Sequence, residues 1–301
     1  FVTREVKDFS LASVSITIAG SVVGLVTLKN KMLGIDLVEE TRVKIGDEVL
    51  GDPNDLSFIL MFPVSFSISL ILTPNIGWKK RLLGLISFPV LFAAVLATQR
   101  RGGLLGIMTV VGIYAYRGMK SKLLFCIVGG SAAAILYVAA GISGRKSGGA
   151  DTEGLDASAE GRLHAWGAAW NMALAHPITG VGLNNFLTNY WYFSDFWDGR
   201  NHAVHSTWFG VLAETGFLGL VLFIWLIYLI MKLAYQTLHQ VERTVKVPPE
   251  ILACSQALLI GLAGTLVAGT FLTQGFNWPI YVLTSLILAL SYWVKKNLEI
   301  T

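Results

Sequence analysis

The chain has 301 residues, of which 54% are hydrophobic and only 14% are charged. A soluble domain of this length does not need so large an apolar fraction, so the composition excludes a soluble globular or disordered protein and predicts an integral membrane protein. The net charge of +4 comes from lysines and arginines in short loops. Because the charge asymmetry of a membrane protein accounts for this excess, we expect no nucleic-acid partner.

Apolar windows of about 17–25 residues are long enough to cross a hydrocarbon layer of roughly 30 Å as α-helices. The sequence contains about eight such windows, which predicts an all-α, polytopic membrane helix bundle that forms a single domain over residues 1–301. Because the chain starts at Phe1 with no initiator methionine or signal sequence, we expect a fragment or processed form of a longer protein, incomplete at its N-terminus. The predicted spans are residues 9–28, 56–74, 82–98, 103–116, 122–142, 207–233, 251–273 and 277–294.

The basic residues predict how the spans are oriented, because lysine and arginine in short loops resist translocation. With about eight spans, all basic clusters fall on one side, which is predicted to be cytoplasmic. The opposite, periplasmic side receives the loop 29–55, the turn at Gln99–Arg101, the segment 143–206 and the link near Gln274. Cys126 and Cys254 lie within predicted spans, so no disulfide is expected.

The periplasmic segment 143–206 is too long for a simple connector, since structureless loops beyond about 15 residues are usually functional or disordered. Residues 143–154 are typical of a flexible linker, and a helix is predicted from Asp156 or Ser158 to about Ala175. That helix has one apolar stripe, so it should lie on the membrane surface as an amphipathic helix. The stripe is Leu163, Trp166, Trp170 and Ala173. The aromatic run Tyr190–Phe193, with Phe196 and Trp197, predicts a lid at the membrane interface.

Three arginines on the predicted periplasmic side lie close to span ends or on this helix. Arg101 starts a helix directly after a span, where a buried guanidinium needs an anionic partner; the alternative is an interfacial arginine that reaches toward water. Arg162 lies on the amphipathic helix, and the alternative to a binding role is that it is an ordinary solvated charge. Arg42 has a local ion pair with Glu39 or Glu40 as its alternative. Together they predict a diphosphate site, because planar guanidinium groups bind phosphate oxygens in pairs.

Two histidines lie where this segment meets the next span. Histidine gains and loses a proton near neutral pH, so His205 is a candidate general base, with a structural histidine as the alternative; His202 is a weaker candidate. The run 206–233 would be about 42 Å long as one helix, so it must protrude, tilt or break near Gly216. Glu214 is a candidate intramembrane carboxylate. It is out of phase with His205, and its alternative role is to cap that break.

No metal site is predicted from the sequence. The usual His-x-x-x-His, Glu-x-x-His and Asp-x-Asp spacings are missing, and the pair His202 and His205 has no evident third ligand. A glycine-rich phosphate loop and a nucleophilic-serine motif are also missing. We therefore expect neither a metal ion nor a cofactor.

Several stretches of the sequence carry a resemblance to a known family. They are Gly51–Ser57, Gln99–Leu105, Glu160–Trp166 running on to His176–Gly182, and His202–Trp208 followed by Glu214–Gly219. In this order the chain resembles the O-antigen ligase and polymerase superfamily, which includes ligases to lipid A core, polymerases, protein O-glycan ligases and exosortase-associated relatives. The resemblance covers most of residues 40–235.

The resemblance implies a GT-C-like enzyme of the bacterial inner membrane, with its active site facing the periplasm. Such enzymes take a glycan from an undecaprenyl diphosphate carrier and pass it to an acceptor hydroxyl of a glycolipid or glycan. By this resemblance Arg101 and Arg162 hold the diphosphate, with Arg100 told apart from Arg101 only by register, and His205 lies near the acceptor. The supporting positions are Arg42, His202 and Glu214.

Two other functions stay open from the sequence. A polymerase would use the sugar of a second lipid-linked repeat as acceptor. A transporter for the same lipid-linked glycan would place charges deep within several spans and show paired broken helices. The charges collect at one face instead, which favours an enzyme.

The predicted orientation can be tested by cysteine labelling in a background with Cys126 and Cys254 replaced by alanine. Ser147→Cys, in the segment 143–206, should react with a membrane-impermeant maleimide from the periplasmic side. Thr244→Cys, in the loop 234–250, should react only after the membrane is opened. Labelling of Ser147→Cys from the cytoplasmic side alone would show that the topology is wrong.

Overall fold

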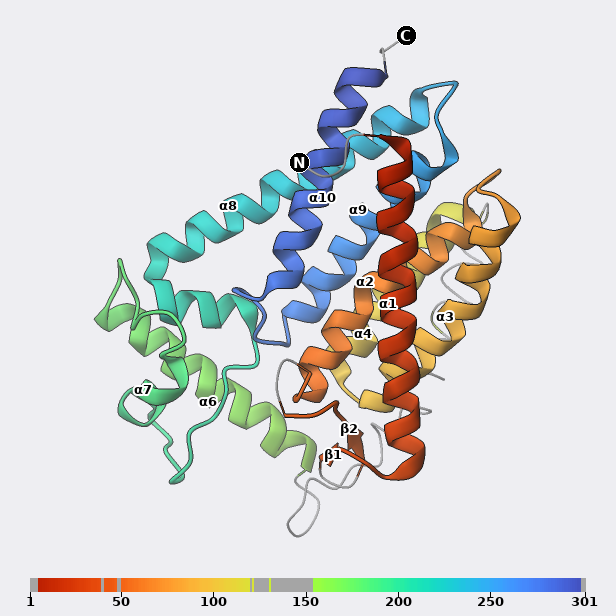
Figure 1. Cartoon of the computed structure of the whole chain (residues 1–301). Coiled ribbons are helices and arrows are strands. Elements are labelled where there is room, and N and C mark those ends of the chain that lie inside the picture. The colour runs from red at the N-terminus through yellow and green to blue at the C-terminus, as the bar shows by residue number, and fades with distance from the viewer. Residues whose placement is uncertain are drawn as a thin grey trace. The chain divides into compact units, whose positions relative to one another are not determined.

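The computed structural model describes residues 5–38, 41–47, 50–119, 121, 130 and 154–298, with only the backbone of 154–159. The described chain is mostly helical (Figure 1). Its elements are α1 (Val6–Leu33), β1 (Leu37–Val38), β2 (Arg42–Val43), α2 (Pro53–Leu72), α3 (Trp78–Thr98), α4 (Arg101–Gly118), α6 (Gly154–Ala175), α7 (Phe186–Phe193), α8 (Thr207–Arg243), α9 (Pro249–Gly269) and α10 (Trp278–Asn297). Two compact units are present: Phe1–Ala140 with Leu229–Ala268 and Trp278–Thr301, and Gly141–Tyr228 with Gly269–Asn277.

Six of the described helices are long and apolar enough to cross a membrane: α1, α2, α3, α8, α9 and α10. They correspond to six of the predicted spans. The predicted span 103–116 forms α4, which has Arg101 and Arg117 near its ends and several glycines, and is not among the six. The predicted span 122–142, with Cys126, lies outside the described residues. The structure therefore supports a polytopic helical protein, while the count of eight stays a prediction.

The first unit is built around α2, the most deeply buried of the apolar helices. It packs against α1, α3 and α4. Two of its serines also bond to α9: Ser65 donates to the Ala257 carbonyl at 2.8 Å and Ser69 to the Ala253 carbonyl at 2.5 Å. Hydroxyl-to-carbonyl bonds of this kind hold membrane helices together where lipid gives no hydrophobic driving force. The surrounding core contains Leu56, Leu60, Met61, Val64, Leu91, Val95, Ile107, Val110 and Ile260.

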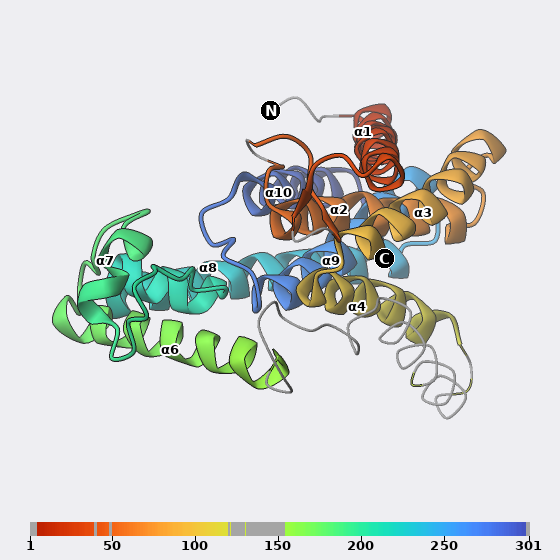
Figure 2. The same cartoon turned by 90° about the horizontal axis from the view of Figure 1, so that it is seen from below.

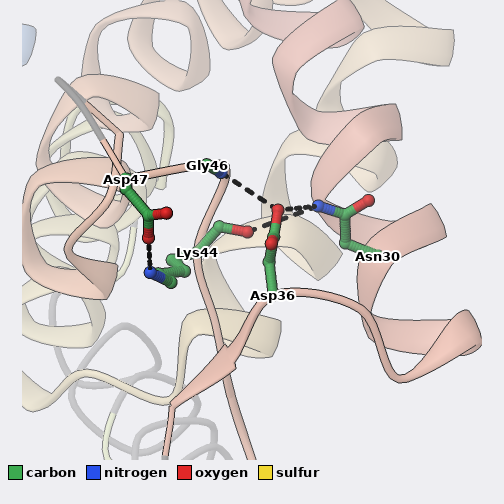
Figure 3. A network of polar contacts seen from close by, with 5 residues as sticks. All are labelled: Asn30, Asp36, Lys44, Gly46 and Asp47. Carbon is green, nitrogen blue, oxygen red and sulfur yellow. Dashed lines mark hydrogen bonds and ion pairs between the residues drawn. The ribbon is translucent and has the colours of Figure 1, made fainter.

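The connection between α1 and α2 is folded back on the end of α1 (Figure 3). The Asp36 carboxylate accepts hydrogen bonds from the Asn30 amide at 3.1 Å and from the Gly46 N–H at 3.0 Å. The Asn30 amide also lies 3.4 Å from the Lys44 carbonyl oxygen. Lys44 forms an ion pair with Asp47, and its hydrogen bond lowers the pKa of that carboxyl. These contacts fix the loop that carries β1 and β2.

The second unit contains α6, α7 and the first part of α8, with α6 running alongside that part of α8 (Figure 2). Its core is made of small and aromatic side chains: Ala165, Ala168, Ala169, Met172, Phe186, Tyr190, Val204 and Ala213. Trp166 stacks on Phe209 of α8, with ring centroids 5.0 Å apart. The unit is therefore a packed body with its own core.

One predicted boundary of this segment needs correction. Helix α6 begins at Gly154, before the predicted caps. It packs on the protein through its alanines. Leu163 and Trp170 of the predicted stripe are 61% and 47% exposed, so they are available to the membrane surface for which the stripe was predicted. Alanines allow a closer approach of two helices than bulky side chains do, which is why the small face is buried. The predicted aromatic lid is also partly core, since Tyr190 is buried.

Helix α8 breaks at Gly216, which is one of the three outcomes that the sequence left open for this run. Gly216 has φ 69° and ψ −171°, which is outside the helical region. A break leaves backbone groups without their usual helical partners, and the segment 177–182 supplies them. The hydrogen bonds run from Val181 N–H to the Ala213 carbonyl at 2.9 Å, from Gly182 N–H to the Glu214 carbonyl at 3.1 Å, and from Phe217 N–H to the Pro177 carbonyl at 2.8 Å.

This pairing predicts that glycine is required at Gly180 and Gly216. Both have positive φ, and an added Cβ would lie 2.4 Å from the Ala213 oxygen at Gly180 and 2.5 Å from the Pro177 oxygen at Gly216. Gly180→Ala and Gly216→Ala should each reduce the free energy of unfolding by about 1–3 kcal/mol or more, measured by thermal unfolding in detergent. Gly167→Ala is the control, because its Cβ would meet nothing within 4 Å. Melting temperatures equal to that of the control would contradict the proposed pairing.

Candidate functional site

The turn between α3 and α4 carries two of the predicted site arginines. Gln99 ends α3 with a left-handed backbone (φ 52°), Arg100 is the N-cap of α4, and Arg101 is its first residue. The N-terminus of a helix carries partial positive charge and exposed N–H groups. The guanidinium charges of Arg100 and Arg101 add to it, so this end of α4 favours an anion.

The two arginines differ in their partners. Arg100 is 19% exposed and lies 4.0 Å from the carboxylate of Asp52, which also caps α2 by accepting the Asn54 N–H at 2.5 Å. No ion pair joins Arg101 to another residue of the described ranges. Arg100 is thus held by an internal carboxylate, and Arg101 is the one that can meet an external anion.

The starts of α4 and α2 approach each other closely. A Cβ added at Gly103 would lie 2.7 Å from the Cβ of Ser57, so a side chain there would separate the two helices. The stretches Gln99–Leu105 and Gly51–Ser57, which are far apart in the sequence, therefore come together in the first unit. The sequence showed both stretches but gave no signal that they pack on each other.

Arg42 belongs to the β1–β2 ribbon of the same unit. It lies opposite Val38, while Val43 lies opposite Leu37. Strand β2 contacts both α1 and α3. The alternative partners suggested by the sequence, Glu39 and Glu40, lie outside the described residues. The structure positions Arg42 on a fixed ribbon and leaves its role untested.

In the second unit, one hydrogen bond joins α6 to the residue before His205. The Trp166 indole N–H donates to the Val204 carbonyl at 3.0 Å. Arg162 precedes Trp166 by one helical turn, about 6 Å along the axis, and residues four apart share a helix face. The contact thus joins the turn of α6 that follows Arg162 to the backbone directly before His205.

His205 is held in an unusual backbone conformation by anchored neighbours. Its φ is 44°, in the left-handed region that non-glycine residues seldom adopt. Ser206 caps α8, since its hydroxyl accepts the Phe209 N–H at 3.5 Å. The Thr207 hydroxyl donates to the Leu272 carbonyl at 2.7 Å and accepts the Gln274 N–H at 3.0 Å. Strained residues held this firmly cluster at functional sites.

His202 has a different environment from His205. Its Nε2 lies 3.0 Å from both carboxylate oxygens of Asp198, and its ring packs edge-on against buried Tyr190 with centroids 5.5 Å apart. Because a carboxylate only accepts, Nε2 is the protonated nitrogen. This hydrogen bond lowers the pKa of Asp198, and a second bond from the Arg200 N–H lowers it to a smaller extent. His202 thus positions the loop around Asp198.

Glu214 lies directly before the break in α8, and its carboxylate points to α7. Its Oε1 accepts the Phe186 N–H at 3.4 Å, at the start of α7. A negative charge at a helix N-terminus is stabilising. The predicted alternative, a carboxylate that caps a helix end, fits this geometry, but the helix that it caps is α7.

The described residues bring some of the predicted positions together. Arg162, His202, His205 and Glu214 lie in the second unit; Arg42, Arg100 and Arg101 lie in the first. Within the described ranges, no group of three or more His, Cys, Asp or Glu side chains has the arrangement of a metal site. Sequence reasoning missed the anchoring roles of Thr207 and Gln274, because their contacts join segments far apart in the chain. The tryptophan at position 166 was noted only as part of an apolar stripe.

Residues 85–224 match the O-antigen ligase family. The matched region includes Arg100, Arg101, Arg162, His202, His205 and Glu214, and it excludes Arg42. No curated protein matches the chain. The match confirms the resemblance seen in the sequence, and together with the six apolar helices it indicates a multi-pass membrane protein.

Proposed function

Because residues 85–224 belong to the O-antigen ligase family, we propose that this chain is a lipid-carrier-dependent glycosyltransferase. Membership of that family indicates a glycan-handling membrane enzyme of the ligase or polymerase type. We propose an O-antigen ligase-like reaction on the periplasmic face of the bacterial inner membrane. The donor is a glycan on undecaprenyl diphosphate and the acceptor is a hydroxyl of a glycolipid or glycan.

The observation that supports this proposal best is the hydrogen bond from Trp166 to the carbonyl of Val204. It ties the α6 turn that follows Arg162 to the backbone that precedes His205, which supports a site made from both. A transfer from a diphosphate carrier needs a cation for the leaving group and a base for the acceptor. Arg162 and His205 supply one of each.

The proposed reaction is a single displacement. The acceptor oxygen forms a bond to the anomeric carbon while the bond from that carbon to the diphosphate oxygen breaks, so the anomeric configuration is inverted. The acceptor proton passes to the His205 imidazole. Arg101 and Arg162 stabilise the negative charge on the departing diphosphate, because guanidinium groups form charge-assisted hydrogen bonds to phosphate oxygens. None of these steps uses a metal ion or a cofactor.

The role of the arginines can be tested with charge-conserving variants. Arg101→Lys and Arg162→Lys keep the charge but lose the two-pronged hydrogen bonding, so each should reduce transfer by about tenfold or more, and alanine should reduce it further. The measurement is transfer from purified lipid-linked donor in a reconstituted system. Exposed Arg200, changed to lysine, is the matched control and should retain full activity. Full transfer by both site variants at normal expression would rule out the diphosphate role.

His205→Ala should fold, insert and bind the lipid-linked donor, yet transfer glycan about 10²–10⁴-fold more slowly, the usual loss when a general base is removed. His239→Ala, at an exposed position near the C-terminal end of α8, is the control and should behave as wild type. Chelators should have little effect on either protein. The mechanism would be abandoned if His205→Ala turned over at near wild-type rates, or if EDTA abolished activity and a divalent ion restored it.

A further inference from the structure

A pocket of about 460 Å³ lies within the second unit, which also contains Arg162 and His205. Its volume falls within the range of about 300–1,000 Å³ that is usual for small-molecule sites. It is lined by Glu160, Gly161, His164, Tyr190, Phe196, Trp197, Asp198 and His202. In sequence, the lining is next to Arg162 on one side and three residues from His205 on the other. None of the mechanism above uses this pocket.

The floor of the pocket is the N-terminal end of the packed face of α6. At about 100° per residue, Gly161 continues the line of buried alanines that includes Ala165 and Ala168. A Cβ at Gly161 would meet nothing within 4 Å, so the face that is filled further along α6 is empty here. Arg162 lies on one flank of this face and His164 on the other. An occupant above Gly161 would therefore lie between these two flanks.

The walls combine aromatic rings with hydrogen-bonding groups. Trp197 and Phe196 are 54% and 62% exposed, although one face of Phe196 is covered by His164, whose ring stacks on it at 4.1 Å. The Glu160 side chain is 68% exposed. The other carboxylate, that of Asp198, is held in place by His202 and the backbone. Fixed aromatic surface and oriented acceptors are thus present together.

This combination suits a sugar ring better than a phosphate, an acidic sugar or a lipid chain. A pyranose has an apolar C–H face, which packs on aromatic rings, and a rim of hydroxyls that donate to carboxylates. The described residues that line the pocket include two carboxylates and neither lysine nor arginine, so they favour a neutral ligand over a phosphate or an acidic sugar. A lipid chain would remove water from the two carboxylates and offer them no hydrogen bond in return, which is unfavourable.

We propose that this pocket binds one neutral or N-acetylated pyranose residue of the glycan that the enzyme handles. The proposal rests on the proposed function, because it takes the ligand to be part of the donor or acceptor glycan. Binding there would hold the chain of sugars beside Arg162 and His205. The occupied pocket would select substrates by the sugar at a set distance from the reacting carbon.

The test fills the pocket without disturbing the helix. Gly161→Leu places an isobutyl group into the empty floor, and Gly167→Leu places the same group at another open position of α6, outside the pocket. Both changes replace glycine by a good helix former, so both should preserve or raise stability. The probes are methyl α-D-glucopyranoside, methyl β-D-galactopyranoside and N-acetylglucosamine. Their binding is measured by saturation-transfer NMR on protein in nanodiscs, since sugar detergents would compete.

We expect at least one probe to bind the wild type and Gly167→Leu equally, with affinity reduced about tenfold or more in Gly161→Leu, a loss of about 1.4 kcal/mol. Trp197→Ala should weaken the same probe. The proposal would be overturned if no probe bound the wild type, if Gly161→Leu bound as well as Gly167→Leu, or if glucose 6-phosphate bound more tightly than the neutral sugars.

Because probe binding is measured without glycan transfer, the binding experiment tests the pocket independently of the proposed reaction. An active His205→Ala variant with unchanged probe binding would contradict the proposed reaction but not the proposed sugar pocket. If Gly161→Leu bound the probes as well as Gly167→Leu while His205→Ala was inactive, the sugar pocket would be contradicted but the proposed reaction would not. In the transfer assay, Gly161→Leu should raise KM for the donor if the bound sugar belongs to the donor, and for the acceptor if it belongs to the acceptor.

Discussion

The second unit depends on how the broken backbone of α8 is paired. An unpaired N–H or carbonyl is costly wherever water is excluded, and most costly in a bilayer. At Gly216 the chain satisfies those groups with the segment that begins at Pro177, which closely approaches the break through Gly180. That segment is covalently joined to α6 and α7, so a local backbone requirement also positions the helices. Glu214 adds a side-chain contact at the same point by holding the start of α7.

This anchoring explains how a long polar segment supports ordered chemistry. Loops usually carry function on a rigid scaffold. Here the scaffold includes the break in α8, the Trp166 contact to Val204, and the two hydrogen bonds of Thr207. Each fixes the backbone on one side of His205 or the other. The histidine is thereby held without requiring its own side chain to be buried.

Sequence reasoning succeeded where one local pattern determined the outcome. Apolar length predicted six of the helices. The excess length of the run after Ser206 left three outcomes open, and a break at Gly216 is the one that the structure shows. Sequence reasoning did not identify the alanine face of α6 as the face that packs on the protein, while Leu163 and Trp170 of the predicted stripe are exposed. Contacts between distant segments were also out of reach, such as Gly103 against Ser57, because a single sequence does not say which elements meet. The domain limits and the site roles are still predictions.

The left-handed backbone of His205 lowers the stability of the fold, whereas the proposed chemistry requires the histidine side chain at this position. Glycine adopts such a φ freely, whereas a residue with a Cβ is disfavoured there by about 1–2 kcal/mol. A chain with glycine at this position would lack the imidazole but would hold its fold more easily. Protein yield and melting temperature would therefore rank a glycine variant at this position above the histidine protein, although the glycine variant lacks the imidazole. If His205 is the proposed base, screens that select only for abundance would enrich variants without it, as expected where function is retained at the expense of stability.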